Sequence, residues 1–253
     1  MKAFQKDLLN VKIFPNRTEM GKDAAADIHS RILELLSRKE QINMVFGAAP
    51  SQNDVLASLV AYDDIDWSRI NAYHMDEYIG LRGEWLKQSF GTYLDEHIFG
   101  LVPFRSINRI DPTAEDPDAE CARYAKLLEE NPTDIVVLGI GENGHIAFND
   151  PWVADFNDPK AVKAVMLDEA CRQQQVNDGC FPSIDLVPKQ AITLTCPTMT
   201  KPPYLFCVVP APTKARAVKR TLEGEISEDC PATILRRHAC VTLYLDADSS
   251  ALL

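Results

Sequence analysis

The chain has 253 residues, of which 46% are hydrophobic and 25% charged, which is enough to bury a full core in one large α/β domain or in two small ones. Its net charge of −11 repels phosphodiester backbones and argues against a nucleic-acid partner. No run of 18 or more apolar residues occurs, and the first residues lack the apolar core of a signal peptide. We therefore expect a soluble, cytoplasmic protein without membrane contact.

The cysteines agree with this expectation. There are seven of them, an odd number, scattered along the chain without any C-x-x-C pair. Cys207 and Cys240 lie in or beside apolar runs, where a thiol behaves as a small hydrophobic group. The pattern favours a reducing compartment over a disulfide-stapled scaffold.

The predicted elements alternate between helix and strand along the chain. Apolar residues at helical spacing predict a first helix over 20–38. Short apolar runs then predict strands, and further helices lie between many of them. The predicted strands are 42–46, 70–73, 135–138, 191–195, 204–209 and 241–245, and the helices are 53–62, 118–130 and 213–223.

This alternation is typical of one fold class. The run 135–138 is apolar at every position, as in a strand that is covered on both faces. No segment reads as an interdomain linker. We therefore predict a single α/β domain over 1–253, with a doubly wound, mostly parallel, Rossmann-like sheet and helices on both faces. In such sheets the ligand lies beyond the carboxyl ends of the strands, so the loops that follow each run are the candidate site.

The loop after the run 135–138 presents a histidine. Three glycines in positions 139–144 allow sharp turns and a close approach to a ligand, and His145 follows them directly. Asn143 and Asp150 are candidates for holding its second ring nitrogen, which fixes tautomer and orientation. A glycine-rich turn with a solvated histidine is the open alternative. A dinucleotide site fits less well, because the G-x-G-x-x-G lies mid-chain and leads to no obvious helix.

The loop after the run 70–73 contains two adjacent acids, Asp76 and Glu77. Neighbouring side chains point in different directions, so only one of them is expected to face a pocket. A carboxylate there can act as the general base for a carbon acid. In the alternative both acids are solvated. For His74 we expect local packing or hydrogen bonding.

Two further loops can hold an anion. Ser51 or Asn53 can cap the helix that follows the run 42–46, and the free N–H groups of a helix start suit a phosphate. Thr213 resembles an N-cap, and Lys214 in the first turn opposes the helix dipole unless an anion binds nearby. An ordinary capped helix and a solvated lysine are the alternatives.

Two longer motifs are more specific than any single residue. Met75-Asp76-Glu77-Tyr78 with Gly80-Leu81, and Gly141-x-x-Gly144-His145-Ile146-Ala147-Phe148-Asn149, resemble M-D-E-Y-x-G-L and G-x-[DN]-G-H-I-A-F-N-E-P. These are signatures of the glucosamine-6-phosphate deaminase/isomerase family, within the 6-phosphogluconolactonase-like superfamily. Further matches in the same order are Ser89-Phe90, Lys214-Ala215, Glu223-Gly224, Pro231-Ala232-Thr233-Ile234-Leu235 and His238, so the resemblance covers about 42–246.

The resemblance implies a reaction and a set of site residues. His145 would help to open the sugar ring, and Asp76 would move a proton from C2 to C1 of glucosamine 6-phosphate. The imino or carbinolamine intermediate then loses ammonia to give fructose 6-phosphate, without metal or cofactor. The implied catalytic residues are Asp76, His145, Asn143 and Asp150, and the implied substrate- and phosphate-binding residues are Ser51, Gln52, Gly144, Arg172 and Lys214.

The chain departs from the family pattern at several positions. The phosphate loop at 49–53 lacks the family's glycines and is about two residues shorter. Asn143 stands where the family often has Asp, and Asp150 stands where it has Glu. Arg172 is the nearest candidate for the arginine of the family's lid, which we expect at about 152–182.

Two alternative functions stay open beside the deaminase. A 6-phosphogluconolactone hydrolase shares the G-x-x-G-H core, although Met75-Asp76-Glu77-Tyr78 favours the deaminase side. A non-catalytic sugar-phosphate sensor would explain the altered phosphate loop. The partner is in each case a small sugar phosphate, and a homo-oligomer remains open because family members differ.

Overall fold

The computed structural model describes residues 1–177 and 179–253. Within them, eight strands form one sheet in the order β1-β2-β11-β10-β7-β3-β4-β6. All neighbouring strands are parallel except β1 and β2, which form an antiparallel hairpin at the edge. The strands are β1 Lys2–Lys6, β2 Leu9–Ile13, β3 Ile42–Phe46, β4 Ile70–His74, β6 Ser106–Asn108, β7 Ile135–Leu138, β10 Tyr204–Val209 and β11 Val241–Leu245.

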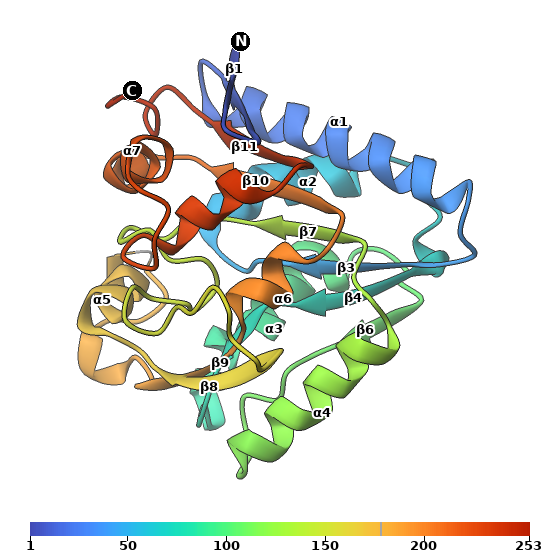
Figure 1. Ribbon diagram of the computed structural model, residues 1–253. Helices are drawn as coiled ribbons and strands as arrows, with labels where there is room; N and C mark the ends of the chain where they lie inside the picture. The colour runs from blue at the N-terminus through green and yellow to red at the C-terminus, as the bar shows by residue number, and fades with distance from the viewer. Residues whose placement is uncertain (178) are drawn as a thin grey trace.

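Helices cover both faces of this sheet (Figure 1). Side chains of α1 and α2 form one apolar core with Ile135 and Val137 of β7, and those of α4, α6 and α7 form another with Val136 and Leu138. The predicted fold class is therefore confirmed. The run 135–138 is apolar at every position because β7 is covered by helices on both faces, as predicted. The helices are α1 Arg17–Leu36, α2 Asn53–Val60, α3 Phe90–Leu94, α4 Pro117–Glu130, α5 Glu169–Asn177, α6 Cys196–Thr200 and α7 Ala215–Glu223. None of those described combines the length and apolar character that a membrane span requires.

One predicted strand belongs elsewhere. The run at 191–195 was expected in the main sheet, but β9 (Gln190–Leu194) lies in a second, antiparallel sheet between β5 (Asp76–Tyr78) and β8 (Val162–Met166). β5 follows β4 after a single residue, so the small sheet continues from the carboxyl edge of the large one. The apolar pattern did not predict β1, β2, β5, β6 and β8. β5 and β6 have three residues each, and β1, β2 and β8 lack a continuous apolar run.

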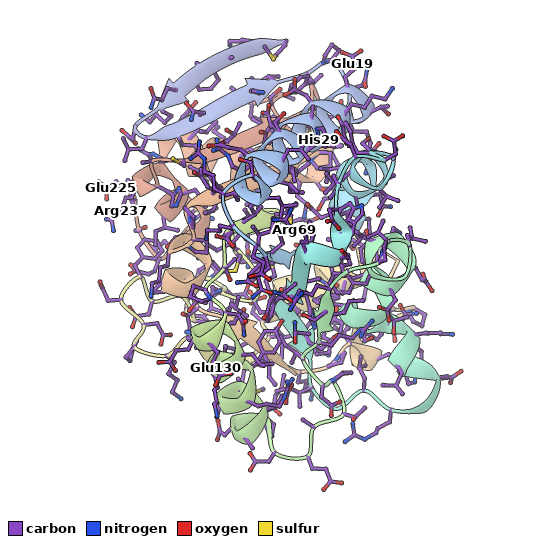
Figure 2. All side chains as sticks on the ribbon, turned by 90° about the vertical axis from the view of Figure 1, so that its right-hand side faces the viewer. Glu19, His29, Arg69, Glu130, Glu225 and Arg237 are labelled. Atoms are coloured by element: carbon purple, nitrogen blue, oxygen red, sulfur yellow. The ribbon has the colours of Figure 1, made fainter. Side chains whose placement is uncertain are left out.

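The first helix begins earlier than predicted, because its first turn is polar. The side chain of Asn16 accepts a hydrogen bond from the backbone N–H of Glu19 at 2.9 Å and so caps α1. Farther along, His29 stacks on Tyr62, and Arg69 donates to the carbonyl of Leu36 near the helix end. Figure 2 labels Glu19 and His29 of this helix, and Arg69 of the 3₁₀ turn Trp67–Arg69. The last two contacts join α1 to Tyr62, two residues after the end of α2, and to the 3₁₀ turn, Trp67–Arg69, that precedes β4.

The strand order reverses between β3 and β7. From β3 the chain passes through α2 to β4 and then β6 on one side, whereas β7, β10 and β11 follow on the other. At such a switch point the loops leave in opposite directions and open a crevice at the carboxyl edge. The loops at 47–52 and 139–145 flank this crevice.

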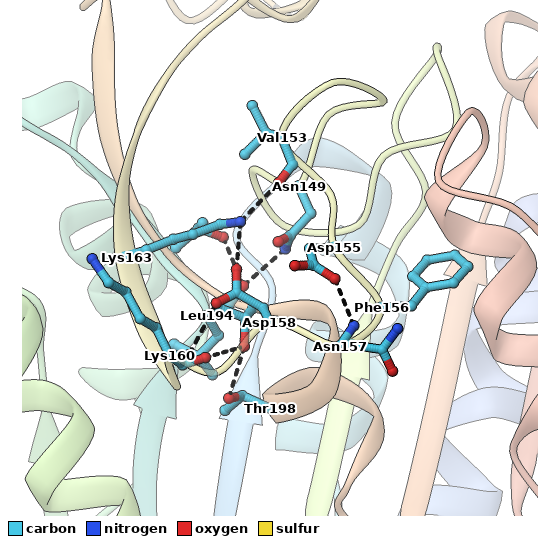
Figure 3. Close-up of polar contacts among 12 residues, drawn as sticks. Asn149, Val153, Asp155, Phe156, Asn157, Asp158, Lys160, Lys163, Leu194 and Thr198 are labelled. Carbon is cyan, nitrogen blue, oxygen red and sulfur yellow. Dashed lines mark hydrogen bonds and ion pairs between the residues drawn. The ribbon is translucent and has the colours of Figure 1, made fainter.

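The expected lid at about 152–182 comprises a loop, β8 and α5, and includes Asp178, which lies outside the described residues. Figure 3 shows how its first part is tied down. Lys163 Nζ donates to Asp158 Oδ2 and to the carbonyl of Val153, both at 2.7 Å. Thr198 Oγ1 donates to the carbonyl of Ala161 at 2.9 Å. Movement of the segment as a lid stays a prediction.

Candidate active site

A cavity of about 170 Å³ opens at the carboxyl edge of the main sheet. The loops after β3, β4, β7 and β10 all contribute to its lining, and α1 and α5 add residues from the sides. Five of the residues selected from the sequence line it: Ser51, Gln52, Asp76, His145 and Lys214. The switch point of the sheet thus brings together side chains that are up to 163 residues apart in the chain.

Asp76 is the carboxylate that faces the cavity. It is 7% exposed, and no ion pair to it occurs within residues 1–177 and 179–253. Burial, and after it the negative charge of Glu77, raises the pKa of Asp76 well above its ordinary value. A carboxylate in this state takes up a proton more readily than a solvated one, as a general base for a C–H bond must.

Glu77 points away from the cavity, as the alternation along a strand predicts. Its carboxylate accepts hydrogen bonds from the backbone N–H groups of Tyr78, Phe90 and Gly91 at 2.9 to 3.0 Å. Burial raises its pKa to about 7, although these three bonds favour the ionised form. Glu77 therefore joins β5 to the start of α3 and supplies a like charge behind Asp76.

His74, directly before this segment, has the local role expected of it. It is fully buried, and its Nε2 accepts a hydrogen bond from the backbone N–H of Ile110 at 2.8 Å. Burial, with Arg109 nearby, lowers the pKa of His74 to about 3, so the ring is neutral.

His145 is oriented by Asn143 and Asp150. Its Nδ1 lies 2.7 Å from Asn143 Oδ1 and 3.1 Å from Asp150 Oδ1. Asn143 Oδ1 also accepts from the backbone N–H of His145, and Asn143 Nδ2 donates to Asp150 Oδ1 at 2.8 Å. Both neighbours of Nδ1 are acceptors, so this nitrogen carries the proton. Nε2 is then left to exchange a proton with a molecule in the cavity.

Asp150 is ionised behind the histidine. Burial alone would raise its pKa, but the contacts with His145, together with Asn143 and Cys171, hold it below the ordinary value. Asn143 and Asp150 do not line the cavity, and their connection to it is through His145. The shorter side chain of Asp150 still reaches its partners.

Two glycines of this loop are required for space. A Cβ at Gly141 would come within 2.1 Å of His145 Cε1, so the imidazole lies directly on the glycine. Gly144 has φ +93°, and a Cβ there would meet Cys230 Sγ at 2.6 Å. Gly144 was expected among the substrate-binding residues, but it lies outside the cavity lining and serves the turn that presents His145.

The residues that the sequence predicted as helix caps near the phosphate do not cap helices. Neither Ser51 nor Asn53 caps α2, because a 3₁₀ turn, Pro50–Gln52, precedes the helix, and Ser51 Oγ accepts instead from Gln52 Nε2 at 3.0 Å. Thr213 likewise lies inside a 3₁₀ turn, Pro212–Lys214, that leads into α7. Lys214 lies at that helix start, 6% exposed, and lines the cavity.

Arg172 is not brought to the cavity. Its Nη2 donates to the backbone carbonyls of Ile184 and Val187, the latter at 3.2 Å, so its charge is directed toward the segment after α5. Gln174 and Gln175 of the same helix line the cavity instead. Gln175 Oε1 accepts from the hydroxyl of Tyr78 at 2.7 Å, and Gln174 Oε1 accepts from the backbone N–H of Glu142 at 3.0 Å.

Arg17, at the start of α1, is a cavity residue that the sequence reasoning missed. Its position depends on the contact between α1 and α2, and the strand that ends four residues before it, β2, was not predicted from the sequence. A substitution pattern among relatives is the signal that could have found it.

Among the described residues, His145, Asp150 and Cys171 place potential metal-ligand atoms within 4.8 Å of one another. The His145 and Asp150 atoms already take part in the network around Asn143. Burial, and the charge of Asp150, raises the pKa of the Cys171 thiol well above its ordinary value. The donor set therefore suits hydrogen bonding better than metal ligation.

Asp76, a carboxylate with a raised pKa, and His145, an imidazole held in one orientation, line the same cavity. Such a pair is typical of an enzyme that transfers protons on a small polar molecule. This is the class that the fold and the cavity define.

The family follows from comparison with known proteins. A model described as glucosamine-6-phosphate isomerases/6-phosphogluconolactonase matches residues 15–244, and the chain belongs to this family. A glucosamine-6-phosphate deaminase of Bacillus cereus (strain B4264) is 36% identical over 221 residues, 87% of this chain and 82% of that protein. One of Lactobacillus delbrueckii subsp. bulgaricus (strain ATCC BAA-365 / Lb-18) is 32% identical over 97% of this chain and 100% of its own length.

Solved structures agree with this assignment. A monomeric glucosamine-6-phosphate deaminase, described as a missing link of the NagB superfamily, superposes with a TM-score of 0.86 at 30% identity, covering 96% of this chain and 99% of that one. A 6-phosphogluconolactonase of Thermotoga maritima has a TM-score of 0.73 at 18% identity, covering 94% and 99%. The second likeness shows the shared fold.

Proposed function

We propose that the chain converts glucosamine 6-phosphate to fructose 6-phosphate and ammonia. The observation that carries the proposal is the pair of Asp76 and His145 on one cavity, the first with a raised pKa and the second with Nε2 left for the substrate. The relatives that are 32% to 36% identical carry the name of this activity.

His145 acts first. The sugar is a closed ring, and opening it requires a proton to leave the 1-hydroxyl and another to reach the ring oxygen. Neutral His145 accepts the first proton at Nε2 and returns one to the ring oxygen from the same atom. The ionised Asp150 behind Nδ1 stabilises the imidazolium that exists in between. The product of this step is the open-chain aldehyde.

Asp76 carries out the isomerisation. As the carboxylate, it takes the proton from C2, which is acidic because it lies next to the C1 carbonyl. The ammonium group at C2 gives one proton to the oxygen at C1 as the enolamine forms, and Asp76 then returns its proton to C1. C2 has become an iminium carbon, and water adds to it and displaces the nitrogen as ammonium, which leaves the ketone. A positioned base contributes about 100- to 10,000-fold to the rate of such a step.

One assay tests the proposal against both alternatives. The protein is incubated with glucosamine 6-phosphate while ammonia and fructose 6-phosphate are measured, and with 6-phosphogluconolactone while acid release is measured. Equal amounts of ammonia and fructose 6-phosphate are the expected result. Hydrolysis of the lactone alone would identify a lactonase, and binding of the amino sugar without turnover would identify a sensor.

We place this activity in the cytoplasm. None of the seven cysteines, which lie within the described residues, forms a disulfide, and Cys207 is fully buried. A reducing compartment maintains such a set. An assay of cell fractions for ammonia release from the amino sugar tests the placement, and activity outside the cell would contradict it.

A further inference from the structure

One end of the cavity is lined by Arg17, Ser51 and Lys214, and we call it the phosphate end. It contains a positive charge, that of Arg17, which belongs to none of the sequence motifs. Arg17 is the first residue of α1, and its side chain lines the cavity together with Ser51 and Lys214. Among the described lining residues, Arg17 and Lys214 are the two with a permanent positive charge. The chain as a whole carries a net charge of −11, so binding a phosphomonoester depends on such local cations.

Arg17 is held in place by only part of its guanidinium group. Nε donates to Asp54 Oδ2 at 2.6 Å, and Nη2 donates to the backbone carbonyl of Pro50 at 2.9 Å. A guanidinium has five N–H donors, so three remain without a partner in the described part of the chain. The side chain is 42% exposed at the cavity rim, where those donors can reach a ligand.

Close helix packing brings Arg17 to this rim. A Cβ at Gly21 would come within 2.5 Å of Asp54 Cβ, so the first turns of α1 and α2 touch at a position that only glycine permits. The contact places Arg17 against the turn Pro50–Gln52 and its neighbour Asp54. The residue is thus part of the wall of the cavity, although it precedes the phosphate loop by more than 30 residues.

The loop at 49–53 differs from the phosphate loop of the family pattern. The loop has neither the glycines nor the length of the family pattern, and Arg172 donates to backbone carbonyls elsewhere. We propose that Arg17 and Lys214 together bind the phosphate group of the substrate, with Arg17 supplying the charge-assisted hydrogen bonds that the shortened loop does not. This inference rests on the proposed function for the identity of the sugar, but not for the phosphate site itself.

The competing explanation is a structural one, in which Arg17 merely ties α1 to the loop. Two variants separate the explanations. Arg17→Ala removes both the charge and the tie, whereas Asp54→Asn weakens the tie and keeps the positive charge. Arg38→Ala is the matched control, because Arg38 lies just beyond the other end of α1 and pairs with Glu34 far from the cavity.

The test measures the affinity for inorganic phosphate by calorimetry, and KM and kcat for glucosamine 6-phosphate. Arg17→Ala should weaken phosphate binding by about 10- to 100-fold, as expected for hydrogen bonds to a charged group, and raise KM similarly. Asp54→Asn should bind phosphate at least as tightly as the unmodified protein, and Arg38→Ala should not differ from it.

Two results would overturn the inference: a phosphate affinity of Arg17→Ala within about twofold of the unmodified protein, or an equal weakening in Asp54→Asn. Should Arg17→Ala fail to fold in a thermal unfolding assay, Asp54→Asn alone decides, because the structural explanation requires it to bind phosphate more weakly. Phosphate binding is measured without turnover. A protein that binds phosphate through Arg17 but releases no ammonia would refute the proposed reaction and leave the site intact.

Discussion

The two ends of the cavity are built differently. At the catalytic end, the side chains of His145 and Asp150 are 9% and 0% exposed, and each is hydrogen-bonded within one small network. At the phosphate end, Arg17 is 42% exposed, and its two partners belong to one helix, α2, and to the turn Pro50–Gln52. Proton transfer needs atoms placed to within fractions of an ångström, whereas an anion is attracted from any direction. The catalytic end therefore keeps the family motif, while the phosphate end departs from it.

The largest effect is expected at the catalytic carboxylate. Asp76→Asn keeps the size of the side chain but removes the base, so kcat for ammonia release should fall by about 100- to 10,000-fold. KM should change little, because the amide still fills the space. Asp63→Asn, an exposed change outside the cavity, is the control. A variant with more than about a tenth of normal kcat would remove Asp76 from its role.

The second largest effect on kcat is expected at Gly141, on which the imidazole of His145 lies. In Gly141→Ala the new Cβ would occupy space now taken by the imidazole, so the ring must shift, and a shift of about 1 Å costs on the order of 100-fold in kcat. The comparison is Gly91→Ala, outside the cavity lining, whose Cβ would have the flexible Arg109 Cδ at 3.3 Å as its nearest neighbour among the described residues. Equal activities of the two variants would show that the ring position is not critical.

The acidic limb of the pH profile of kcat/KM tests how closely the groups at the catalytic end are coupled. Asp76 must be ionised to act, so its raised pKa moves the fall of kcat/KM toward neutral pH. After burial, the charge of Glu77 contributes to this rise. Glu77→Gln should therefore shift the acidic limb to lower pH, while the value at alkaline pH reports whether the variant is folded. An acidic limb that stays in place or moves to higher pH would contradict the influence of the Glu77 charge on Asp76.

The smallest effect is expected at the phosphate end. Lys214→Ala should raise KM by about 10-fold with kcat nearly constant, because the phosphate is bound alike in the ground and transition states. Steady-state kinetics with glucosamine 6-phosphate measures both constants. A fall in kcat at unchanged KM would assign Lys214 to the reacting end of the sugar.

The sequence predicted those parts of the molecule that depend on local patterns. The strands at 42–46, 135–138, 204–209 and 241–245 have the predicted bounds, because strands buried on both faces leave a largely apolar run in the sequence. Asp76 and His145 were found because they come two residues after β4 and seven residues after β7, within the two family motifs. The small sheet was missed, since its three-residue strand β5 carries two acids that become buried only in the tertiary structure.

The errors at the phosphate end have a common origin. Whether Arg172 or Gln175 of α5 faces the cavity depends on how that helix is rotated, and a short polar helix has little apolar periodicity to reveal it. The approach of Arg17 depends on a contact between two helices. Neither can be derived from residues adjacent in the chain.

Through the contact at Gly21, the packing of α1 on α2 determines where Arg17 lies, and with it the affinity for the substrate. A bulkier residue there would push the first turn of α1 away from α2, and would carry the guanidinium of Arg17 with it. The loss would appear as weaker capture of the anion, with the proton-transfer groups across the crevice undisturbed. Changes in the N-terminal helix can thus adjust the substrate concentration at which the protein works without altering how fast it turns over once filled.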